Sequence, residues 1–322
     1  MSIQIGIVGG AGYTAGELLR LLIHHPEANI RFVHSTSNAG NPISAVHTDL
    51  VGETDLHFTD EVDTEIDVLF VCAGHGKTKP FLEAHDLPAS LKVIDLSRDF
   101  RLKEPGNAFV YGLPELNREE IRKTQFLANP GCFATCIQLG LLPLAAAGKL
   151  NDEVHVHAIT GSTGAGQKPM ATTHFSWRNN NLSVYKAFSH QHLGEIVQSL
   201  TQLQAGFEHS VNFLPMRGDF ARGIYASLYL KSDLSEEDAV QLYEDFYADH
   251  PFTHVTAENP HLKQVVNTNK GLVHVEKHGD KLLILSMIDN LLKGASGQAV
   301  QNMNLMFGLP ETLGLHLKAM AF

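Results

Sequence analysis

Residues 3–22, IQIGIVGGAGYTAGELLRLL, decide the fold of this chain. The apolar run Ile3–Val8 ends in a cluster of glycines, and the spacing of Thr14 and Glu17 predicts a capping box at the start of an amphipathic helix. A second β-like run follows at 30–33. A strand, a glycine turn, a helix and a strand in this order predict a βαβ unit, and therefore a parallel sheet.

The same alternation continues downstream of this unit. Strands are expected at 66–72, 91–96 and 125–128, and helices at 78–85 and after the cap formed by Asn117 and Glu120. The sequence therefore predicts an α/β fold with a doubly wound, mostly parallel Rossmann-type sheet over roughly the first 130 residues.

The pattern changes beyond residue 131. A long apolar helix is expected at 132–147, ending at Gly148. Further strands are expected at 154–159, 209–214, 223–230, 262–266, 272–277 and 282–288, with helices at 192–203, 235–247 and 295–307. The segment His278-Gly279-Asp280 predicts a hairpin turn, and Ser235 with Asp238 predicts a helix cap. Strands in hairpin order predict a second, α+β domain on a mixed sheet.

Composition limits the partners of the protein. Its 322 residues carry 35 acidic and 24 basic side chains, a net charge of −11, which argues against nucleic acid or an anionic membrane surface. The longest apolar stretch, LGLLPLAAAG (139–148), is too short to cross a bilayer. Three cysteines are too few for a disulfide framework, so a reducing compartment, the cytoplasm, is expected.

The first turn predicts a nucleotide site. Gly9, Gly10 and Gly12 follow a strand and open a helix, where a pyrophosphate can approach the backbone; the alternative is a tight turn without a ligand. The second strand ends in HSTSN (34–38) with no acidic residue. Because the hydroxyls of Ser35 and Ser37 can receive a 2′-phosphate that a carboxylate would repel, NADP is expected rather than NAD.

A second phosphate motif is incomplete. Gly74-His75-Gly76-Lys77-Thr78 ends like a P-loop, but Val71 occupies the position of the required first glycine. An NTPase is therefore not expected.

The segment Asn129-Pro130-Gly131-Cys132 places a cysteine at the start of the long apolar helix. A helix N-terminus favours the thiolate, and Gly131 leaves room for a substrate carbonyl, although a structural cysteine is the simpler alternative. Cys136 and Cys72 are expected to be packing residues. A glycine turn combined with a helix-start cysteine suggests hydride transfer to a carbon held as a thioester.

Longer motifs resemble one known family. The segments LANPGCFAT (127–135) and DNLLKGASGQAVQNMNLMFG (289–308) resemble the signatures of the N-acetyl-gamma-glutamyl-phosphate reductases. The resemblance covers nearly the whole chain and includes GGAGYTAGE (9–17), DLSRDFRL (95–102), YGLPE (111–115), TGSTGAG (160–166) and HQH (190–192).

The resemblance implies a fold related to the aspartate-semialdehyde dehydrogenases and an enzyme of arginine biosynthesis. It implies NADPH-dependent reduction of N-acetyl-γ-glutamyl phosphate to the γ-semialdehyde with release of phosphate. Cys132 would form the thioester, with His190 as acid and base and His192 in support. Residues 1–131 would bind NADP, completed by the C-terminal helix 293–322, and residues 132–292 would form the catalytic, substrate and oligomerisation domain of a homo-oligomer.

The residues expected in the site come from both domains. The expected cofactor contacts are Gly9, Gly10, Gly12, Tyr13, Thr14, Ser35, Ser37, Gly74, Ser97, Gly164 and Asn290. The expected substrate contacts are Asn129, Ser162, His192, Arg101 and Arg222. No metal is expected.

One stretch departs from the family pattern. Residues 215–223, PMRGDFARG, match only at their ends, with Met216 and Asp219 in place of a histidine and a proline. The acyl group of the substrate is therefore open: N-acetyl is expected, with N-succinyl or another acyl phosphate as the alternative.

Two other classes of protein remain as alternatives. One is a non-catalytic NADP-binding sensor, which would not need Cys132. The other is a metal-dependent hydrolase that uses the pairs His155/His157 and His190/His192, although such a site needs further ligands.

Overall fold

The computed structural model describes residues 2–321, which form two compact units. Among these residues, unit 1 consists of 2–130 and 295–316, and unit 2 of 131–294 and 317–321. Residues 1 and 322, the outer bounds of the predicted domains, lie outside the described residues.

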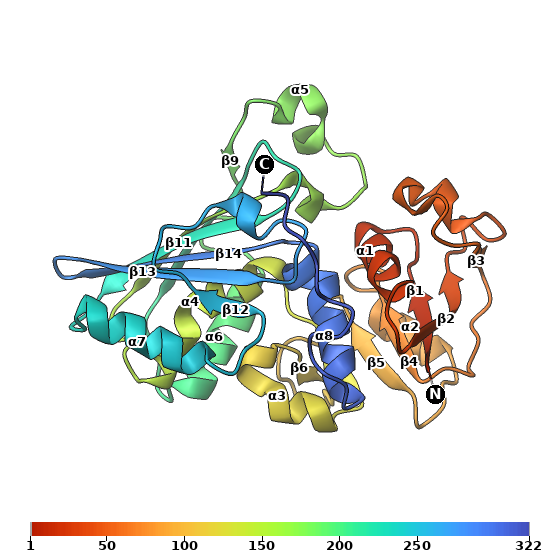
Figure 1. Cartoon of the computed structure of the whole chain (residues 1–322), viewed down its shortest axis with the longest axis horizontal. Coiled ribbons are helices and arrows are strands. Elements are labelled where there is room, and N and C mark those ends of the chain that lie inside the picture. The colour runs from red at the N-terminus through yellow and green to blue at the C-terminus, as the bar shows by residue number, and fades with distance from the viewer. Residues whose placement is uncertain (1, 322) are drawn as a thin grey trace. The chain divides into compact units, whose positions relative to one another are not determined.

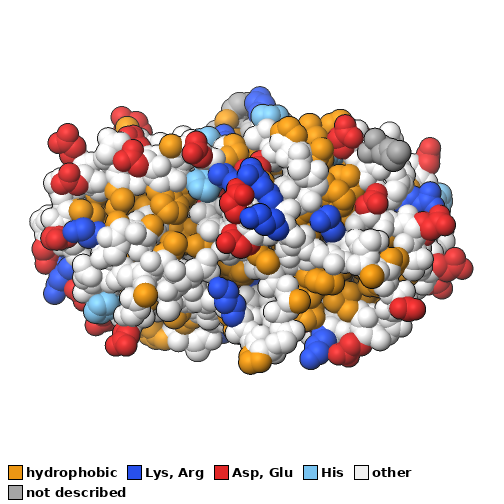
Figure 2. Space-filling model, turned by 90° about the horizontal axis from the view of Figure 1, so that it is seen from below, with side chains coloured by type: hydrophobic (Ala, Val, Ile, Leu, Met, Phe, Trp, Pro, Cys, Tyr) orange, Lys and Arg blue, Asp and Glu red, His pale blue; other side chains and the backbone are white. Residues whose placement is uncertain are grey.

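No helix among residues 2–321 is long and apolar enough to cross a membrane. On the face drawn in Figure 2, acidic and basic side chains are interspersed with apolar ones.

Unit 1 is built on a seven-stranded parallel sheet with the order β3-β2-β1-β4-β5-β7-β6. Its strands are β1 (Ile3–Val8), β2 (Ala28–His34), β3 (Phe58–Thr59), β4 (Val68–Val71), β5 (Lys92–Asp95), β6 (Val110–Tyr111) and β7 (Phe126–Ala128). Its helices are α1 (Tyr13–Leu22), α2 (Thr78–Ala84), α3 (Pro114–Lys123) and α8 (Gly297–Met306). The predicted doubly wound sheet is confirmed. The order reverses between β1 and β4, which is where such sheets bind ligands.

Helix α8 belongs to unit 1 although it lies near the end of the chain. It packs against α1 and α3 (Figure 1). The Asn302 side chain donates a 2.8 Å hydrogen bond to the carbonyl of Gly112, and the imidazole of His25 lies 3.0 Å from Asn304 Oδ1. Buried side-chain amides on α8 therefore bind this helix to the rest of unit 1 by specific hydrogen bonds.

Unit 2 is built on a mixed seven-stranded sheet with the order β12-β13-β14-β11-β8-β10-β9. Its strands are β8 (Val154–Thr160), β9 (Ser183–Val184), β10 (Val211–Arg217), β11 (Ile224–Lys231), β12 (Thr253–Val255), β13 (Gly271–His278) and β14 (Lys281–Ile288). Its helices are α4 (Cys132–Ala146), α5 (Phe175–Arg178), α6 (His192–Leu203) and α7 (Glu236–Tyr247). The β8–β10 and β12–β13 pairs are parallel and the others antiparallel, so the predicted mixed sheet is confirmed.

The register of this sheet brings several strand termini to one end. Thr160 at the end of β8 lies opposite both Arg217 and Ile224, and Ile224 lies opposite Ile288 at the end of β14. The segments that follow β8, β10 and β14 therefore leave the sheet at the same end.

Helix α4 forms the centre of the core of unit 2. Its side chains are buried almost all round, against β11, β14 and the helices α6 and α7. Pro143 inside the helix has no amide hydrogen for the carbonyl of Leu139, four residues earlier. The hydroxyl of Tyr247 on α7 donates to that carbonyl at 2.5 Å, so a second helix satisfies the group that the proline leaves open.

Most predicted elements are confirmed, including the hairpin in which His278 pairs with Lys281 and Gly279 has φ +59°. The Ser235 cap is also confirmed, because its hydroxyl accepts from the amide of Asp238. The predicted capping box of α1 is wrong.

Helix α1 begins at Tyr13, which places Thr14 inside the first turn. Gly12 is the N-cap, no side chain caps it, and Glu17 pairs with Arg20 at 2.7 Å. In α3, Leu113 is the N-cap, followed by Pro114, and Asn117 lies at a kink where two helical segments join, with φ −126° and ψ 30°. The Asn117 side chain donates to the carbonyl of Tyr111.

The strand predicted at 262–266 is also wrong. Residues Leu262–Gln264 form a 3₁₀ turn. Val265 packs with Leu272 and Met287 on the unit 2 sheet. The apolar run therefore packs on the sheet without pairing with any of its strands. Hydrophobic periodicity alone does not distinguish such a segment from a buried strand.

Candidate active site

The glycine loop, residues 9–12, lies at the switch point of unit 1. Gly9 has φ +77°, and a Cβ there would lie 2.5 Å from the carbonyl carbon of Cys72. A Cβ on Gly10 would lie 2.4 Å from Val33 Cγ1. These two glycines are required by backbone geometry and packing, because no larger residue fits without a shift of the neighbouring strands.

Gly12 differs from the other two glycines of the loop. A Cβ on Gly12 would meet only the carbonyl oxygen of Gly9, at 3.7 Å. No side chain caps α1 at this point. An uncapped helix start beside open space suits the pyrophosphate of a dinucleotide, so the residues fit the predicted cofactor, with Tyr13 and Thr14 in the first turn.

The end of β2 carries hydroxyls and an amide. The Asn38 side chain donates to Ser35 Oγ and Ser37 Oγ, both at 3.1 Å. The two serines predicted to receive the 2′-phosphate therefore lie together, and no carboxylate occurs among residues 34–38.

Buried polar groups hold the loop after β4. Asp95 accepts from the hydroxyls of Thr78 (2.6 Å) and Ser97 (2.8 Å), and burial raises the pKa of Asp95. Asp99 accepts from the amides of Gly76 and Thr78 at the start of α2. The position where a P-loop would hold a phosphate is therefore occupied by a carboxylate of this chain. Gly74 is exposed with φ +89°, and the predicted contact Ser97 is buried beneath this loop.

Arg101 and Asn129 hold the segment that precedes the cysteine. The buried Arg101 guanidinium donates to the carbonyls of Asn129 (2.9 Å) and Leu96 (3.1 Å). The Asn129 side chain donates to the carbonyl of Ala295 and accepts from Asn302. Both residues predicted to bind substrate therefore make structural hydrogen bonds within unit 1.

Cys132 is the first residue of α4, at the start of unit 2. Its N-cap is Gly131, and no side chain caps the helix there. Burial raises the pKa of both Cys72 and Cys136 to about 12, and the Cys136 thiol donates to the carbonyl of Ser286. Among the three thiols, only Cys132 lies at a helix N-terminus, the position that favours a reactive thiolate.

Two glycines allow other groups to approach Cys132 closely. A Cβ on Gly294 would lie 2.8 Å from Cys132 Cβ, and a Cβ on Gly131 would lie 2.4 Å from His192 Nε2. The segment that contains Gly294 is a π-helical turn, Leu292–Ser296. The imidazole of His192 and the π-turn therefore pack directly against the segment 131–132.

Glu195 connects this histidine to the cysteine segment. One carboxylate oxygen accepts from the amide of Gly131 at 2.8 Å, and the other lies 3.9 Å from His192 Nε2. Glu195 is buried on α6, one helical turn after His192. We did not identify Glu195 from the sequence, although an i,i+3 pair on a predicted helix is a usable signal.

His190 occupies an apolar cage. Its ring lies edge to face with Phe133, Tyr185 and Phe213, at centroid distances of 5.6, 5.8 and 5.5 Å. Burial, and then the charge of Lys186, lowers the pKa of His190 to about 4, and its Nδ1 accepts from the amide of His192. His190 is therefore neutral at pH 7 and supports the backbone of its neighbour.

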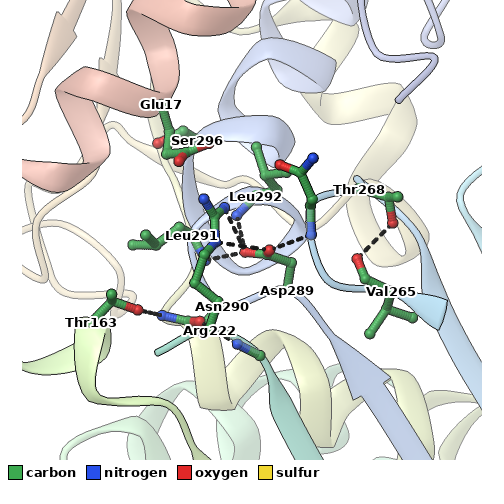
Figure 3. A network of polar contacts seen from close by, with 12 residues as sticks. Glu17, Thr163, Arg222, Val265, Thr268, Asp289, Asn290, Leu291, Leu292 and Ser296 are labelled. Atoms are coloured by element: carbon green, nitrogen blue, oxygen red, sulfur yellow. Dashed lines mark hydrogen bonds and ion pairs between the residues drawn. The ribbon is translucent and has the colours of Figure 1, made fainter. Parts of the chain in front are cut away.

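Asp289 is the centre of a buried network at the end of β14 (Figure 3). Its carboxylate accepts from Nε and Nη2 of Arg222, both at 3.1 Å, and from the backbone amides of Asn267, Leu291 and Leu292. Its carbonyl accepts from the amide of Gly294 at 2.9 Å. Arg222, expected to bind substrate, is therefore held by Asp289, which stabilises the turn that places Gly294 against Cys132.

Asn290 lies beside the loop after β8. Its side chain accepts from the amide of Gly223 at 2.7 Å and donates to Thr163 Oγ1 at 3.0 Å. A Cβ on Gly164 would lie 4.0 Å from the Asn290 amide nitrogen, and Ser162 opens the same 3₁₀ turn. The structure thus brings together the predicted residues Ser162, Gly164 and Asn290.

The histidines of β8 do not gather metal ligands. The ring of His155 stacks on Tyr229 at 4.8 Å and 14°, and His157 faces the same tyrosine. Among residues 2–321, no group of three or more histidine, cysteine, aspartate or glutamate side chains is placed to hold a metal ion.

A parallel nucleotide-type sheet and a cysteine at an uncapped helix start are both features of one class of proteins, the dinucleotide-dependent oxidoreductases. Two family models match, the semialdehyde dehydrogenase NAD binding domain at residues 4–124 and the semialdehyde dehydrogenase dimerisation domain at residues 132–290. The chain is also 64% identical over 321 residues to an N-acetyl-gamma-glutamyl-phosphate reductase of Bacteroides fragilis, covering 99% of this chain and 100% of the relative. The chain belongs to the N-acetyl-gamma-glutamyl-phosphate reductase family, within the semialdehyde dehydrogenases.

Other comparisons agree with this membership. Reductases of the same name from Phocaeicola vulgatus and Flavobacterium johnsoniae are 63% and 57% identical, each covering 99% of this chain and 100% of the relative. Aspartate semialdehyde dehydrogenase II of Vibrio cholerae, solved as a complex with ASA, is similar in structure with a TM-score of 0.74 at 16% identity, covering 96% of this chain and 99% of that one. The Candida albicans aspartate semialdehyde dehydrogenase, solved with NADP, has a TM-score of 0.72 at 14% identity, covering 95% and 99%. The fold relationship predicted from the sequence is confirmed.

Proposed function

We propose that this protein catalyses the NADPH-dependent reduction of N-acetyl-γ-glutamyl phosphate to the γ-semialdehyde, with release of phosphate, in arginine biosynthesis. The observation that carries the proposal is Cys132 at an uncapped helix start, packed against His192 and Gly294, in a chain 64% identical to a reductase of that name.

The residues of unit 2 account for the acyl-transfer half of the reaction. The thiol of Cys132 loses its proton to His192, whose imidazole covers the Gly131 segment and lies near Glu195. The thiolate then attacks the γ-acyl carbon, the carbon–oxygen bond to phosphate breaks, and His192 returns the proton to the departing phosphate. A thioester on Cys132 remains.

The second half returns the enzyme to its thiolate form. NADPH, when bound, supplies the hydride that reduces the acyl carbon. The tetrahedral species on Cys132 then collapses, its carbon–sulfur bond breaks, and the aldehyde leaves with Cys132 again a thiolate, which takes up one proton from water to restore the starting thiol. Amide groups at the start of α4 stabilise this charge.

His192 is the proton carrier in this scheme, whereas the sequence favoured His190. His190 is neutral, enclosed by aromatic rings and bonded to the amide of His192, which supports a positioning role. In this scheme the two histidines act at different atoms, His192 at the thiol and His190 at the backbone amide of His192.

The glycine loop and the serines after β2 are the proposed NADPH contacts of unit 1, and residues 131–294 carry the catalytic groups. Gly164 and Asn290 are proposed to contact the cofactor, and Ser162 the substrate.

N-succinyl-γ-glutamyl phosphate is the second candidate substrate, because residues 216–219 depart from the family pattern. We also propose a homo-oligomer, since the unit 2 match is a dimerisation domain, and a cytoplasmic location, since the cysteine content is sparse.

The variant Cys132→Ser tests the proposal. It should reduce turnover of the semialdehyde with phosphate and NADP at least about 1,000-fold, because the alcohol is a far weaker nucleophile, while NADPH still binds. Cys136→Ala, one helical turn away, is the matched control and should retain turnover. Unchanged turnover in Cys132→Ser would exclude the thioester mechanism and favour a different role for the bound cofactor.

A further inference from the structure

The proposed substrate carries several oxyanions, and the two arginines expected to bind them are engaged elsewhere. Arg222 is held by the buried carboxylate of Asp289, and Arg101 donates to two backbone carbonyls. A carboxylate or phosphate bound near Cys132 requires a different cationic partner in unit 2.

Arg217 lies at the end of the sheet where the site residues gather. It is the last residue of β10 and pairs in register with Thr160, the last residue of the parallel strand β8. The loop after Thr160 contains Ser162 and Gly164 and contacts Asn290. Arg217 therefore stands at the carboxyl ends of two parallel strands, the edge where α/β proteins bind ligands.

A chain of ring contacts connects Arg217 to the cysteine. Its guanidinium lies over the ring of Tyr185, with Cζ 4.8 Å from the ring centroid. The Tyr185 ring contacts His190, and His190 contacts Phe133, the neighbour of Cys132. Burial, and then the charge of Cys132, raises the pKa of Tyr185 to about 12, which agrees with a position close to the thiol.

The Nε donor of Arg217 has no hydrogen-bond partner, whereas the guanidinium nitrogens of its neighbour Arg178 all donate hydrogen bonds. Arg178 is buried and donates to the carbonyls of Thr172, Asn181 and Arg217 and to Ser183 Oγ. By contrast, Nε of the half-buried Arg217 is shielded from solvent and has no hydrogen-bond partner. A guanidinium donor that is shielded from water and has no acceptor costs free energy, and a bound ligand that supplies an acceptor would remove this cost.

The nearby charges also favour an anion. Arg178 adds a second positive charge beside Arg217, and the nearby carboxylate of Asp219, which accepts from the amide of Asn180, offsets part of the charge of Arg178. These three side chains together still carry a net positive charge.

We propose that Arg217 is a substrate-binding residue whose guanidinium receives an oxyanion, carboxylate or phosphate, of the substrate held at Cys132. This inference rests on the proposed function. The oxyanion can be the α-carboxylate, the phosphate, or an additional carboxylate in the N-acyl group. Arg217 also adds to the predicted site a residue from the stretch 215–223, which departs from the family pattern.

The test compares Arg217→Met with the matched control Lys231→Met. Both variants remove one positive charge from the same sheet. Lys231, however, is exposed at the last position of β11, whereas Arg217 lies at the end of the sheet where β11 begins. KM is measured for N-acetylglutamate semialdehyde, N-succinylglutamate semialdehyde and inorganic phosphate in the direction of NADP reduction. Arg217→Met should raise KM about 10- to 100-fold for each ligand that carries the group bound by Arg217, the effect of one charge-assisted hydrogen bond, and Arg217→Lys should recover part of the loss.

The pattern of change identifies the group that Arg217 binds. A rise for both semialdehydes indicates the α-carboxylate, a rise for phosphate alone indicates the phosphate, and a rise for the N-succinyl compound alone indicates the acyl carboxylate. Constants within twofold of the wild type in Arg217→Met, or an equal rise in Lys231→Met, would overturn the proposal. Arg217→Gln replaces Arg217→Met if the latter does not fold.

A second measurement separates this inference from the proposed function. Alkylation of Cys132 by iodoacetamide is followed with and without N-acetylglutamate, N-succinylglutamate or inorganic phosphate as protecting ligand. Protection that the wild type shows and Arg217→Met loses supports Arg217 even if the wild type does not turn over either semialdehyde. Absence of turnover would contradict the proposed function, whereas equal protection in both proteins would contradict the role of Arg217.

Discussion

The glycine loop of unit 1 and the cysteine site of unit 2 are built on different principles. The loop is made of backbone: Gly9 and Gly10 leave no room for a Cβ, and the helix start is left without a side-chain cap. The cysteine site is made of side chains from distant segments, with His192 and Glu195 on α6 and Asp289 after β14.

This difference determines how each region should respond to substitution. A backbone site is lost when a side chain is added to a glycine. A side-chain site is lost when one buried polar partner is removed, because the remaining partner is left without compensation. Substitutions in the two regions should therefore fail in different ways.

Asp289→Asn should have the largest effect on stability. It leaves the guanidinium of Arg222 without its buried counter-charge, so the free energy of unfolding should fall by about 3–5 kcal/mol. Urea denaturation measures this loss. Asp233→Asn, which removes an exposed pair with Lys149, is the control and should cost less than about 1 kcal/mol. A similar cost for both variants would show that the Asp289 network does not stabilise the turn.

His190 should make stability depend on pH. Its pKa is about 4 in the folded protein against 6.5 in an ordinary environment, so the unfolded chain binds a proton that the folded one does not between these values. The free energy of unfolding should therefore decrease as the pH falls from 6.5 to 4, by up to about 3 kcal/mol more in the wild type than in His190→Asn. Parallel stability curves for the two proteins would contradict the buried neutral state of His190.

Two substitutions in the glycine loop should differ from each other. Gly9→Ala places a side chain at φ +77° against the backbone of Cys72, so it should destabilise the protein without cofactor by about 1–3 kcal/mol. Gly12→Ala meets open space and should leave that stability unchanged, but weaken NADPH binding about tenfold because its Cβ enters the proposed phosphate position. NADPH titration by fluorescence gives the affinity. Wild-type affinity in Gly12→Ala would show that the phosphates do not approach this residue.

The same difference explains how far the sequence could be interpreted. The order of elements in unit 1, the glycine loop and the helix beginning at Cys132 follow from local pattern, because period and turn residues act over short distances. The two-residue strands β6 and β9 and the 3₁₀ turn at Leu262 depend on neighbours elsewhere in the chain and were not predicted.

The candidate site divides in the same way. The position of Cys132 at a helix start could be predicted, and the structure confirms that position. The roles of Arg101 and Arg222 could not, because an arginine that binds a carbonyl or a buried aspartate has the same local sequence as one that binds a substrate. Glu195, Asp289 and Gly294 act through contacts with residues 64, 67 and 162 positions away in the chain, which a single sequence does not display.

The proline in α4 has a consequence for the order in which the protein is made. The carbonyl of Leu139 is satisfied by Tyr247, about a hundred residues later, so the helix that carries Cys132 cannot complete its hydrogen bonds when it leaves the ribosome. Synthesis must reach α7 before this hydrogen bond of the helix that begins at Cys132 can form. The native hydrogen bonding of α4 is therefore complete only after most of unit 2 has been translated.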